Sequence, residues 1–225
     1  MLIGVAGMVG TGKTTLARSL AARFGLQIAL ESVDDNPWLE SFYGTRDDMR
    51  AYALHLQLHF LATRFAGMRR MRGLGGSWVL DRTWYEDAEV FALGHFEQGL
   101  MTSDEWTLYR RLYKELLHSP AARPPRLLLY LHGPLDVIVG RIAMRGRPKE
   151  RDAAPEYWSA LHDRYERWIR GFRHCPVLPL DVRDHDLVAD PDAVEDIAAR
   201  VRLELEGELP QTELWPAAVR QRALA

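Results

Sequence analysis

The sequence contains a single cysteine, Cys175, so no disulfide can form within the chain. Such a chain suits a reducing compartment, and we expect a cytoplasmic location. No segment approaches the roughly 20 consecutive apolar residues that a membrane span requires. The apolar residues Met1–Ala6 follow no basic segment and lead directly into a glycine-rich turn, so we expect no signal peptide.

An excess of one charge is also lacking. Lys and Arg number 29 and Asp and Glu number 31, which gives a formal net charge of −2. This balance argues against binding to a nucleic-acid polymer or a membrane surface. The sequence shows no internal repeat and no low-complexity segment. Its 225 residues, 47% of them hydrophobic, are enough for one domain whose core needs no covalent reinforcement.

Short apolar segments alternate along the chain with segments of helical periodicity. Strands are predicted at residues 2–6, 27–30, 78–80, 127–131 and 177–180, and helices at 16–24, 46–72, 86–98, 103–117, 135–144, 157–172 and 190–205. This alternation predicts an α/β fold with a five-stranded parallel sheet and helices on both faces. We expect one domain over residues 1–225, with a loosely packed tail at 206–225.

A complete phosphate-binding motif joins the first predicted strand to the first predicted helix. The pattern G-x-x-x-x-G-K-[ST] is matched by Gly7, Met8, Val9, Gly10, Thr11, Gly12, Lys13 and Thr14. The glycines let backbone N–H groups and the helix N-terminus face a phosphate. Lys13 is expected to reach the β- and γ-phosphates, and Thr14 to offer its hydroxyl to Mg²⁺. The motif predicts a P-loop NTPase-type fold with a bound nucleoside triphosphate.

Charged residues follow the second and third predicted strands, at the edge of the sheet where ligands bind. Glu31 could orient an acceptor hydroxyl and take its proton. Asp81 could hold Mg²⁺ through water, and Arg82 could brace Glu31 or the transferring phosphoryl group. No N-K-x-D base-reading motif is present, and Asp81 is followed by arginine rather than by the acidic or sensor residue of a motor ATPase. These features favour a small-molecule kinase.

A second cationic cluster is formed by Arg141, Arg145 and Arg147. Arg141 and Arg145 are four residues apart, so they share a face if the helix extends that far. We expect a lid at about 141–152 whose guanidinium groups stabilise charge on the transferred phosphoryl group. His55, His59 and His95 have no metal-ligand spacing with the cysteine, and no role is assigned to them.

Several motifs, in order along residues 7–205, resemble the deoxyribonucleoside kinase family, in particular the bacterial deoxyadenosine/deoxyguanosine kinases. The matching segments are Gly7–Thr15, Glu31 with Asn36–Tyr43, Leu56–Arg64, Asp81–Asp87 and Arg141–Glu150. The resemblance implies a general base at Glu31, with Arg82 beside it. It also implies that Thr15 belongs to the phosphate-binding segment.

The resemblance further implies how each substrate is held. Gln57 would form two hydrogen bonds with the nucleobase, and Arg64 with Asp87 would complete its recognition. Tyr43 and Glu150 would bind the sugar 3′-hydroxyl. Arg145 and Arg147 would contact phosphates, and Arg141 would stack on the base of ATP. Relatives of this kind are homodimers, and the predicted helices 46–72 and 103–117 are candidates for the interface.

The expected reaction is ATP + deoxynucleoside → ADP + deoxynucleoside 5′-monophosphate, with Mg²⁺. We expect purine acceptors, namely deoxyadenosine or deoxyguanosine, and a role in nucleotide salvage. One alternative is a nucleoside-monophosphate kinase of the thymidylate type. That acceptor needs cationic groups near Glu31, whereas Asp34 and Asp35 stand there. Another alternative is a non-catalytic nucleotide-binding subunit that serves assembly. The presence of Lys13 and Arg82 together with Glu31 argues against it.

Overall fold

The computed structural model describes residues 1–30, 36–147, 150, 153–185, 187 and 190–206. The chain divides into two compact units. Unit 1 comprises Met1–Ala29, Ser77–Arg82 and Pro124–Ala225, and unit 2 comprises Leu30–Gly76 and Thr83–Arg123. The expectation of one domain over residues 1–225 stays a prediction, and the tail expected from residue 206 lies almost wholly outside the described residues.

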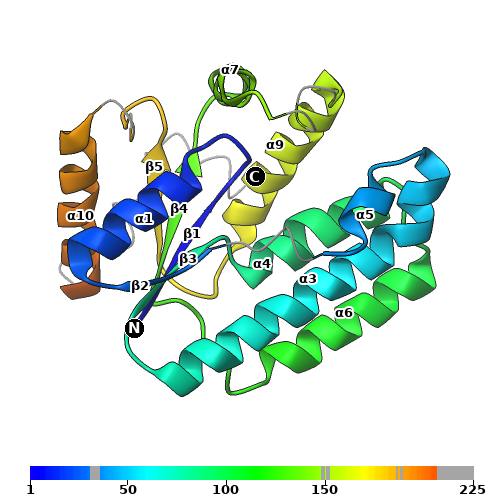
Figure 1. The fold of residues 1–225 in the computed structure, drawn as a ribbon, viewed down its shortest axis with the longest axis horizontal. Helices are drawn as coiled ribbons and strands as arrows, with labels where there is room; N and C mark the ends of the chain where they lie inside the picture. The colour runs from blue at the N-terminus through cyan, green and yellow to red at the C-terminus, as the bar shows by residue number, and fades with distance from the viewer. Residues whose placement is uncertain (31–35, 148–149, 151–152, 186, 188–189, 207–225) are drawn as a thin grey trace. The chain divides into compact units, whose positions relative to one another are not determined.

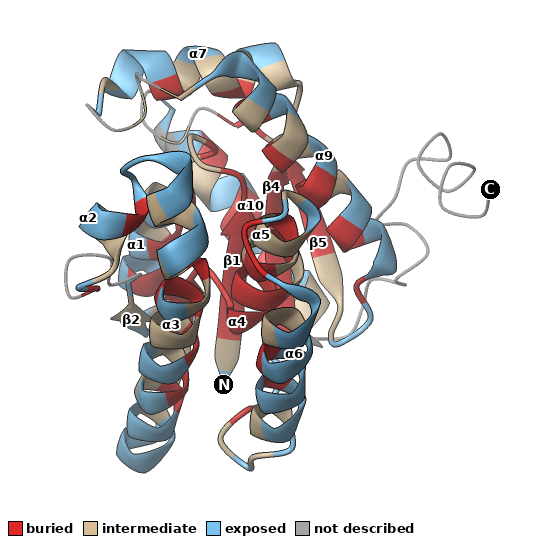
Figure 2. Ribbon diagram, turned by 90° about the vertical axis from the view of Figure 1, so that its right-hand side faces the viewer, coloured by how far each residue is buried: buried red, intermediate tan, exposed pale blue. Residues whose placement is uncertain are grey.

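Unit 1 is built on a five-stranded parallel sheet with the order β2-β3-β1-β4-β5. The strands are β1 (Leu2–Gly7), β2 (Gln27–Ala29), β3 (Trp78–Asp81), β4 (Leu127–His132) and β5 (Val177–Asp181). The central strands β1 and β4 are buried along most of their length, as Figure 2 shows. Strands buried on both faces read as continuous apolar runs, which explains why they were recognisable in the sequence.

In the part of unit 1 that the structure describes, this sheet is surrounded by α1 (Lys13–Phe24), α7 (Leu135–Arg145), α9 (Pro155–Gly171) and α10 (Pro191–Glu206). Figure 1 shows α1 and α10 together on one face and α9 on the other. The buried residues Leu16 and Leu20 hold α1 against the sheet, and the helix ends at Gly25, whose φ of 63° is left-handed. The three-layer α/β arrangement expected from the sequence is confirmed.

Unit 2 is helical within the described residues. Its elements are α2 (Leu39–Phe42), α3 (Arg46–Leu74), α4 (Trp84–Glu86), the π-helix η1 (Asp87–Ala92), α5 (Leu93–Glu97) and α6 (Ser103–Leu117). The two long helices each begin with a capping box, formed by Thr45 with Asp48 in α3 and by Thr102 with Glu105 in α6. These caps satisfy N–H groups that the first helical turn leaves without partners.

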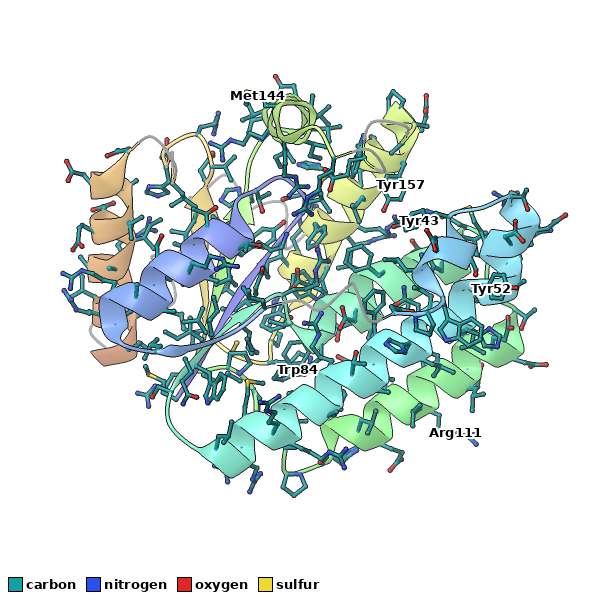
Figure 3. All side chains as sticks on the ribbon, in the orientation of Figure 1. Tyr43, Tyr52, Trp84, Arg111, Met144 and Tyr157 are labelled. Carbon is teal, nitrogen blue, oxygen red and sulfur yellow. The ribbon has the colours of Figure 1, made fainter. Side chains whose placement is uncertain are left out.

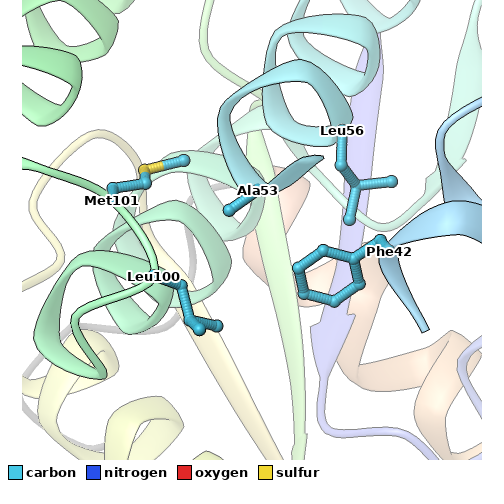
Figure 4. Close-up of a cluster of buried hydrophobic side chains, with 5 residues drawn as sticks. All are labelled: Phe42, Ala53, Leu56, Leu100 and Met101. Atoms are coloured by element: carbon cyan, nitrogen blue, oxygen red, sulfur yellow. The ribbon is translucent and has the colours of Figure 1, made fainter. Parts of the chain in front are cut away.

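A small apolar cluster holds α2 against α3 in unit 2 (Figure 4). Its buried members are Phe42, Ala53, Leu56, Leu100 and Met101. Phe42 is only 3% exposed, and burial of such a side chain contributes about 1.5–3 kcal/mol. The cluster therefore fixes the N-terminal half of α3, which carries one of the expected base-binding residues.

The element boundaries differ from the sequence expectation mainly around residue 86. A helix was expected over 86–98, but the helical segment begins at Trp84 and passes through the π-helix η1 before α5. Hydrophobic periodicity does not distinguish a short π segment from an α-helix, so the sequence could not reveal it. In the described part of the chain, no helix combines the length and hydropathy that crossing a membrane requires.

Candidate active site

The phosphate-binding loop joins β1 to α1 through glycines with positive φ. The φ angle is 141° at Gly7, 87° at Gly10 and 94° at Gly12, and residues with a Cβ rarely adopt such values. Space also excludes side chains: a Cβ on Gly10 would lie 2.5 Å from Cγ1 of Ile142, and one on Gly7 would meet the carbonyl oxygen of Leu131. The turn therefore requires the glycines that define the motif.

The carbonyl oxygen of Met8 holds the loop in this shape. It accepts hydrogen bonds from the Thr11 backbone N–H at 3.3 Å, from the Thr11 hydroxyl at 2.8 Å and from the Lys13 ammonium at 2.9 Å. Val9 completes the turn, and Thr15 follows in the first turn of α1. The Lys13 ammonium is thus held over the loop. A phosphate carries the negative charge that a carbonyl lacks, so it competes well for this lysine.

Thr14 and Asp81 meet where α1 begins and β3 ends. The Thr14 hydroxyl donates to Oδ2 of Asp81 at 2.6 Å. The second carboxylate oxygen, Oδ1, is buried and has no hydrogen-bond partner in the described part of the chain. An oxygen-rich pair with an unsatisfied buried carboxylate oxygen fits Mg²⁺, which binds one or two carboxylates together with waters and phosphate oxygens. No group of three or more His, Cys, Asp or Glu suited to a metal occurs among the described residues.

Arg82 is strained and buried at the end of β3. It is the one non-glycine residue with positive φ in the described chain, at 73°, and such a conformation costs on the order of 1–3 kcal/mol. Its backbone N–H donates to the Val5 carbonyl at 2.9 Å, and its Nη1 donates to the hydroxyl of Tyr165 at 3.1 Å. Arg82 as a whole residue is 6% exposed. These contacts hold an arginine against its backbone preference, which is a pattern of functional sites.

Two tyrosines of α9 that sequence reasoning missed belong to the surroundings of Arg82. Tyr165 is 1% exposed and accepts the hydrogen bond from Arg82. Burial raises the pKa of Tyr157, against the opposite effects of the nearby Arg164 and Arg82. Figure 3 labels Tyr157 on α9. The two tyrosines are eight residues apart and so share a helical face, which is the one sequence signal that could have linked them.

The lid arginines all have partners within unit 1. Arg141 donates to the carbonyl oxygen of Val182 at 2.6 Å. Arg145 forms a 2.5 Å ion pair with Glu150, and Nη1 of Arg147 lies 3.9 Å from the same carboxylate. The structure thus places Arg145 and Arg147 beside Glu150, while their expected roles toward phosphates and the sugar 3′-hydroxyl stay predictions. Arg145 is the last residue of α7 rather than the first one beyond the helix.

Unit 2 brings together the residues expected to recognise a nucleobase. Arg64 donates from Nε to Oδ2 of Asp87 at 2.9 Å and from Nη2 to Oδ1 at 3.2 Å, so the pair is bidentate. Both side chains are largely buried, at 14% and 4% exposed. Gln57 lies seven residues before Arg64 on α3 and therefore on the same helical face. It is 2% exposed.

The remaining predicted residues are placed less completely. Glu31, the expected general base, lies outside the described residues. Tyr43 follows α2 and is 54% exposed, and Figure 3 labels it. Its assignment to the sugar hydroxyl stays a prediction. The structure therefore brings together the glycine turn, Lys13, Thr14 and Asp81 in unit 1, and it buries Gln57, Arg64 and Asp87 in unit 2.

Known proteins resemble this chain along most of its length. A family model described as deoxynucleoside kinase matches residues 3–205. The deoxyadenosine/deoxycytidine kinase of Bacillus subtilis is 42% identical over 200 residues, which cover 89% of this chain and 91% of the relative. The deoxyguanosine kinase of Lactobacillus acidophilus is 31% identical over 218 residues, which cover 93% of each chain.

Solved structures share the fold. A deoxyadenosine kinase from M. mycoides with bound dATP has a TM-score of 0.75 at 23% identity, covering 90% of this chain and 100% of that one. The same enzyme with bound dCTP has a TM-score of 0.74 at 22% identity, covering 90% and 99%. These matches confirm the P-loop type of α/β fold that the glycine motif predicted.

Proposed function

Because the chain belongs to the deoxynucleoside kinase family, whose members are ATP-dependent phosphotransferases, we propose that it phosphorylates purine deoxynucleosides and prefers deoxyadenosine. The observation that carries the proposal is the buried polar set of unit 2, formed by Gln57 and the Arg64–Asp87 pair. A buried amide offers one donor and one acceptor, as the edge of a nucleobase requires. The reaction transfers the γ-phosphoryl group of ATP to the 5′-hydroxyl of the deoxynucleoside.

We assign the triphosphate of ATP to residues Gly7–Thr15. Their support is the glycine turn, the Lys13 ammonium held over it and the start of α1. Thr14 and Asp81 would hold Mg²⁺, with Asp81 acting through a coordinated water. When bound, the ion neutralises charge on the β- and γ-phosphates. Arg141, Arg145 and Arg147 are the proposed lid residues that contact ATP.

Phosphoryl transfer needs a base, and we assign this role to Glu31. The 5′-oxygen forms a bond to the γ-phosphorus while the bond from that phosphorus to the β,γ-bridging oxygen breaks, and the proton of the 5′-hydroxyl passes to the carboxylate. Arg82 offers a preorganised positive charge for this step. Replacing Glu31 with Gln should lower kcat by about 10²–10⁴ while ATP binding is retained.

The preference for bases that carry an amino group, adenine among them, has two supports. The relative at 42% identity is named for deoxyadenosine and deoxycytidine, whose bases both carry an exocyclic amino group next to a ring nitrogen that accepts. The Oε1 atom of Gln57 is a buried acceptor without a partner in the described residues, and an amino group would satisfy it. Thymidine should be a poor substrate, since a guanidinium at Arg64 would crowd its methyl group.

The test is the initial rate of phosphorylation of the four deoxynucleosides with saturating ATP and Mg²⁺. Deoxyadenosine should give the highest kcat/KM and thymidine the lowest. Lys13→Ala is the matched control, since it should abolish turnover of all four without altering unit 2. Dominant turnover of thymidine would overturn the proposed specificity, and failure to phosphorylate any of the four would overturn the proposed substrate class.

We also propose a homodimer in the cytosol. The exposed leucines Leu108 and Leu112, 56% and 41% exposed, lie one turn apart on α6, and an exposed apolar pair of this kind favours a partner surface. Light scattering coupled to size-exclusion chromatography should give twice the chain mass. Leu108→Glu should shift that mass toward the monomer.

A further inference from the structure

The amide of Gln57 is held by a histidine that belongs to a different helix of unit 2. Its Nε2 lies 3.4 Å from Nδ1 of His95, on α5. An amide NH₂ group can only donate, so in this arrangement Nδ1 accepts. That requires a neutral imidazole with its proton on Nε2. The contact therefore couples the tautomer of His95 to the orientation of the Gln57 amide, and each tautomer fits one of the two orientations.

The His95 ring is itself held in place. It stacks on Phe42, with ring centroids 4.8 Å apart and an interplanar angle of 28°, and Phe42 belongs to the buried apolar cluster of Figure 4. The chain just after α5 is fixed by the Leu100 N–H, which donates to the His95 carbonyl at 2.9 Å. These contacts fix the position of the imidazole ring, and so of Nδ1, beside the amide.

The fixed amide leaves a defined pattern for a ligand. The Nε2 atom keeps a second N–H, while Oε1 is buried and lacks a partner in the described part of the chain. An unsatisfied buried acceptor is costly, so a ligand must bring a donor to Oε1. A flipped amide would exchange donor and acceptor, and it would place Oε1 against the lone pair of His95 as long as Nδ1 carries no proton.

The two orientations of the Gln57 amide suit different nucleobases. Adenine and cytosine present an amino donor beside a ring nitrogen acceptor. Guanine and thymine present an oxo acceptor beside a ring N–H donor. For a base bound in a given orientation, adenine and cytosine need one orientation of the amide, and guanine and thymine need the opposite one. A group that fixes the amide therefore selects between amino and oxo bases.

We infer that His95 is a specificity-determining positioning residue, which holds the Gln57 amide in the orientation that accepts amino-bearing deoxynucleosides and disfavours oxo-bearing ones. The inference rests on the proposed function, since it needs Gln57 to face a nucleobase. It assigns His95 no contact with the substrate or with the reacting atoms.

The test compares kcat/KM for deoxyadenosine with kcat/KM for deoxyguanosine in three variants. His95→Leu removes the acceptor, so the ratio should fall about fivefold, which corresponds to one hydrogen bond of about 1 kcal/mol. His95→Asp places an acceptor oxygen at the same branch of the side chain and should keep the ratio near that of the parent enzyme. His118→Leu, at the exposed end of α6, is the matched control and should leave the ratio unchanged.

A spectroscopic readout tests the geometry without turnover. Long-range ¹H–¹⁵N spectra of the unliganded protein should show His95 as the neutral tautomer protonated on Nε2, with Nδ1 unprotonated. A protonated Nδ1, or an active His95→Leu variant with an unchanged ratio, would overturn the inference. If instead the parent enzyme phosphorylates none of the deoxynucleosides, the proposed function is at fault. Should His95→Leu fail to fold, the tautomer spectrum of the parent protein decides alone.

Discussion

Replacing Tyr165 with Phe removes one hydroxyl and leaves the ring of a residue that is 1% exposed. That hydroxyl accepts the 3.1 Å hydrogen bond from Nη1 of Arg82. Hydrogen bonds to charged groups contribute about 1.5–3 kcal/mol, and a buried group left without its partner adds a desolvation penalty. The free energy of unfolding should fall by about 1.5 kcal/mol. Since Arg82 already sits in a strained backbone conformation, its guanidinium should also lose its fixed direction, and kcat should fall about tenfold.

The assay pairs initial rates of deoxyadenosine phosphorylation with urea unfolding of the same preparations. Tyr130→Phe is the control, because Tyr130 is equally buried at 2% exposed and its hydroxyl donates to the charged Glu166 at the same distance of 3.1 Å. It should lose similar stability and retain kcat. Unchanged kcat in Tyr165→Phe, or an equal loss of kcat in both variants, would refute the positioning role of Tyr165.

Asp81→Asn should raise the Mg²⁺ concentration for half-maximal activity by about 10–100-fold, as expected for a group that acts through a metal-bound water, and a magnesium titration of the rate checks this. Gly10→Ala should weaken ATP binding at least tenfold, because φ is 87° and the added Cβ would lie 2.5 Å from Ile142. Calorimetric titration measures the affinity for ATP. Gly140→Ala is the control, since nothing lies within 4 Å of a Cβ added there. Burial raises the pKa of the Cys175 thiol to about 12, so at pH 8 the folded protein should react with a disulfide reagent far more slowly than the urea-unfolded chain; equal rates would contradict this.

The fold was accessible from the sequence because its signals are local. Buried parallel strands such as β4 appear as unbroken apolar runs, and the turn at Gly7, Gly10 and Gly12 requires residues without a side chain. The glycine turn with Lys13 and Thr14 could be predicted for the same reason, since all of it lies within eight consecutive residues, and its role in phosphate binding stays a prediction. Asp81 could be placed because parallel strands end at one edge of the sheet.

The rest of the site depends on contacts between residues far apart in the sequence. Nothing near Arg82 predicts its positive φ, which is maintained by a strand neighbour and by Tyr165 in α9. His95 was given no role, because a lone histidine has no spacing signal and its meaning comes from Gln57, 38 residues away. Arg64 and Asp87 were paired by resemblance to a family, and periodicity alone would have left both as ordinary helical charges.

The π-helix between Asp87 and His95 has a consequence for how relatives should be aligned. A π segment holds one more residue in its turn than an α-helix does, and removal of a residue there would restore regular α-helical winding. In an α-helix each residue advances the helix by about 100°, at 3.6 residues per turn. A single deletion within Asp87–Ala92 removes one residue but lets the others turn by this larger angle, so His95 would keep nearly the same direction relative to Asp87. Relatives can therefore be aligned with a one-residue gap in this segment without changing how His95 lies relative to Asp87.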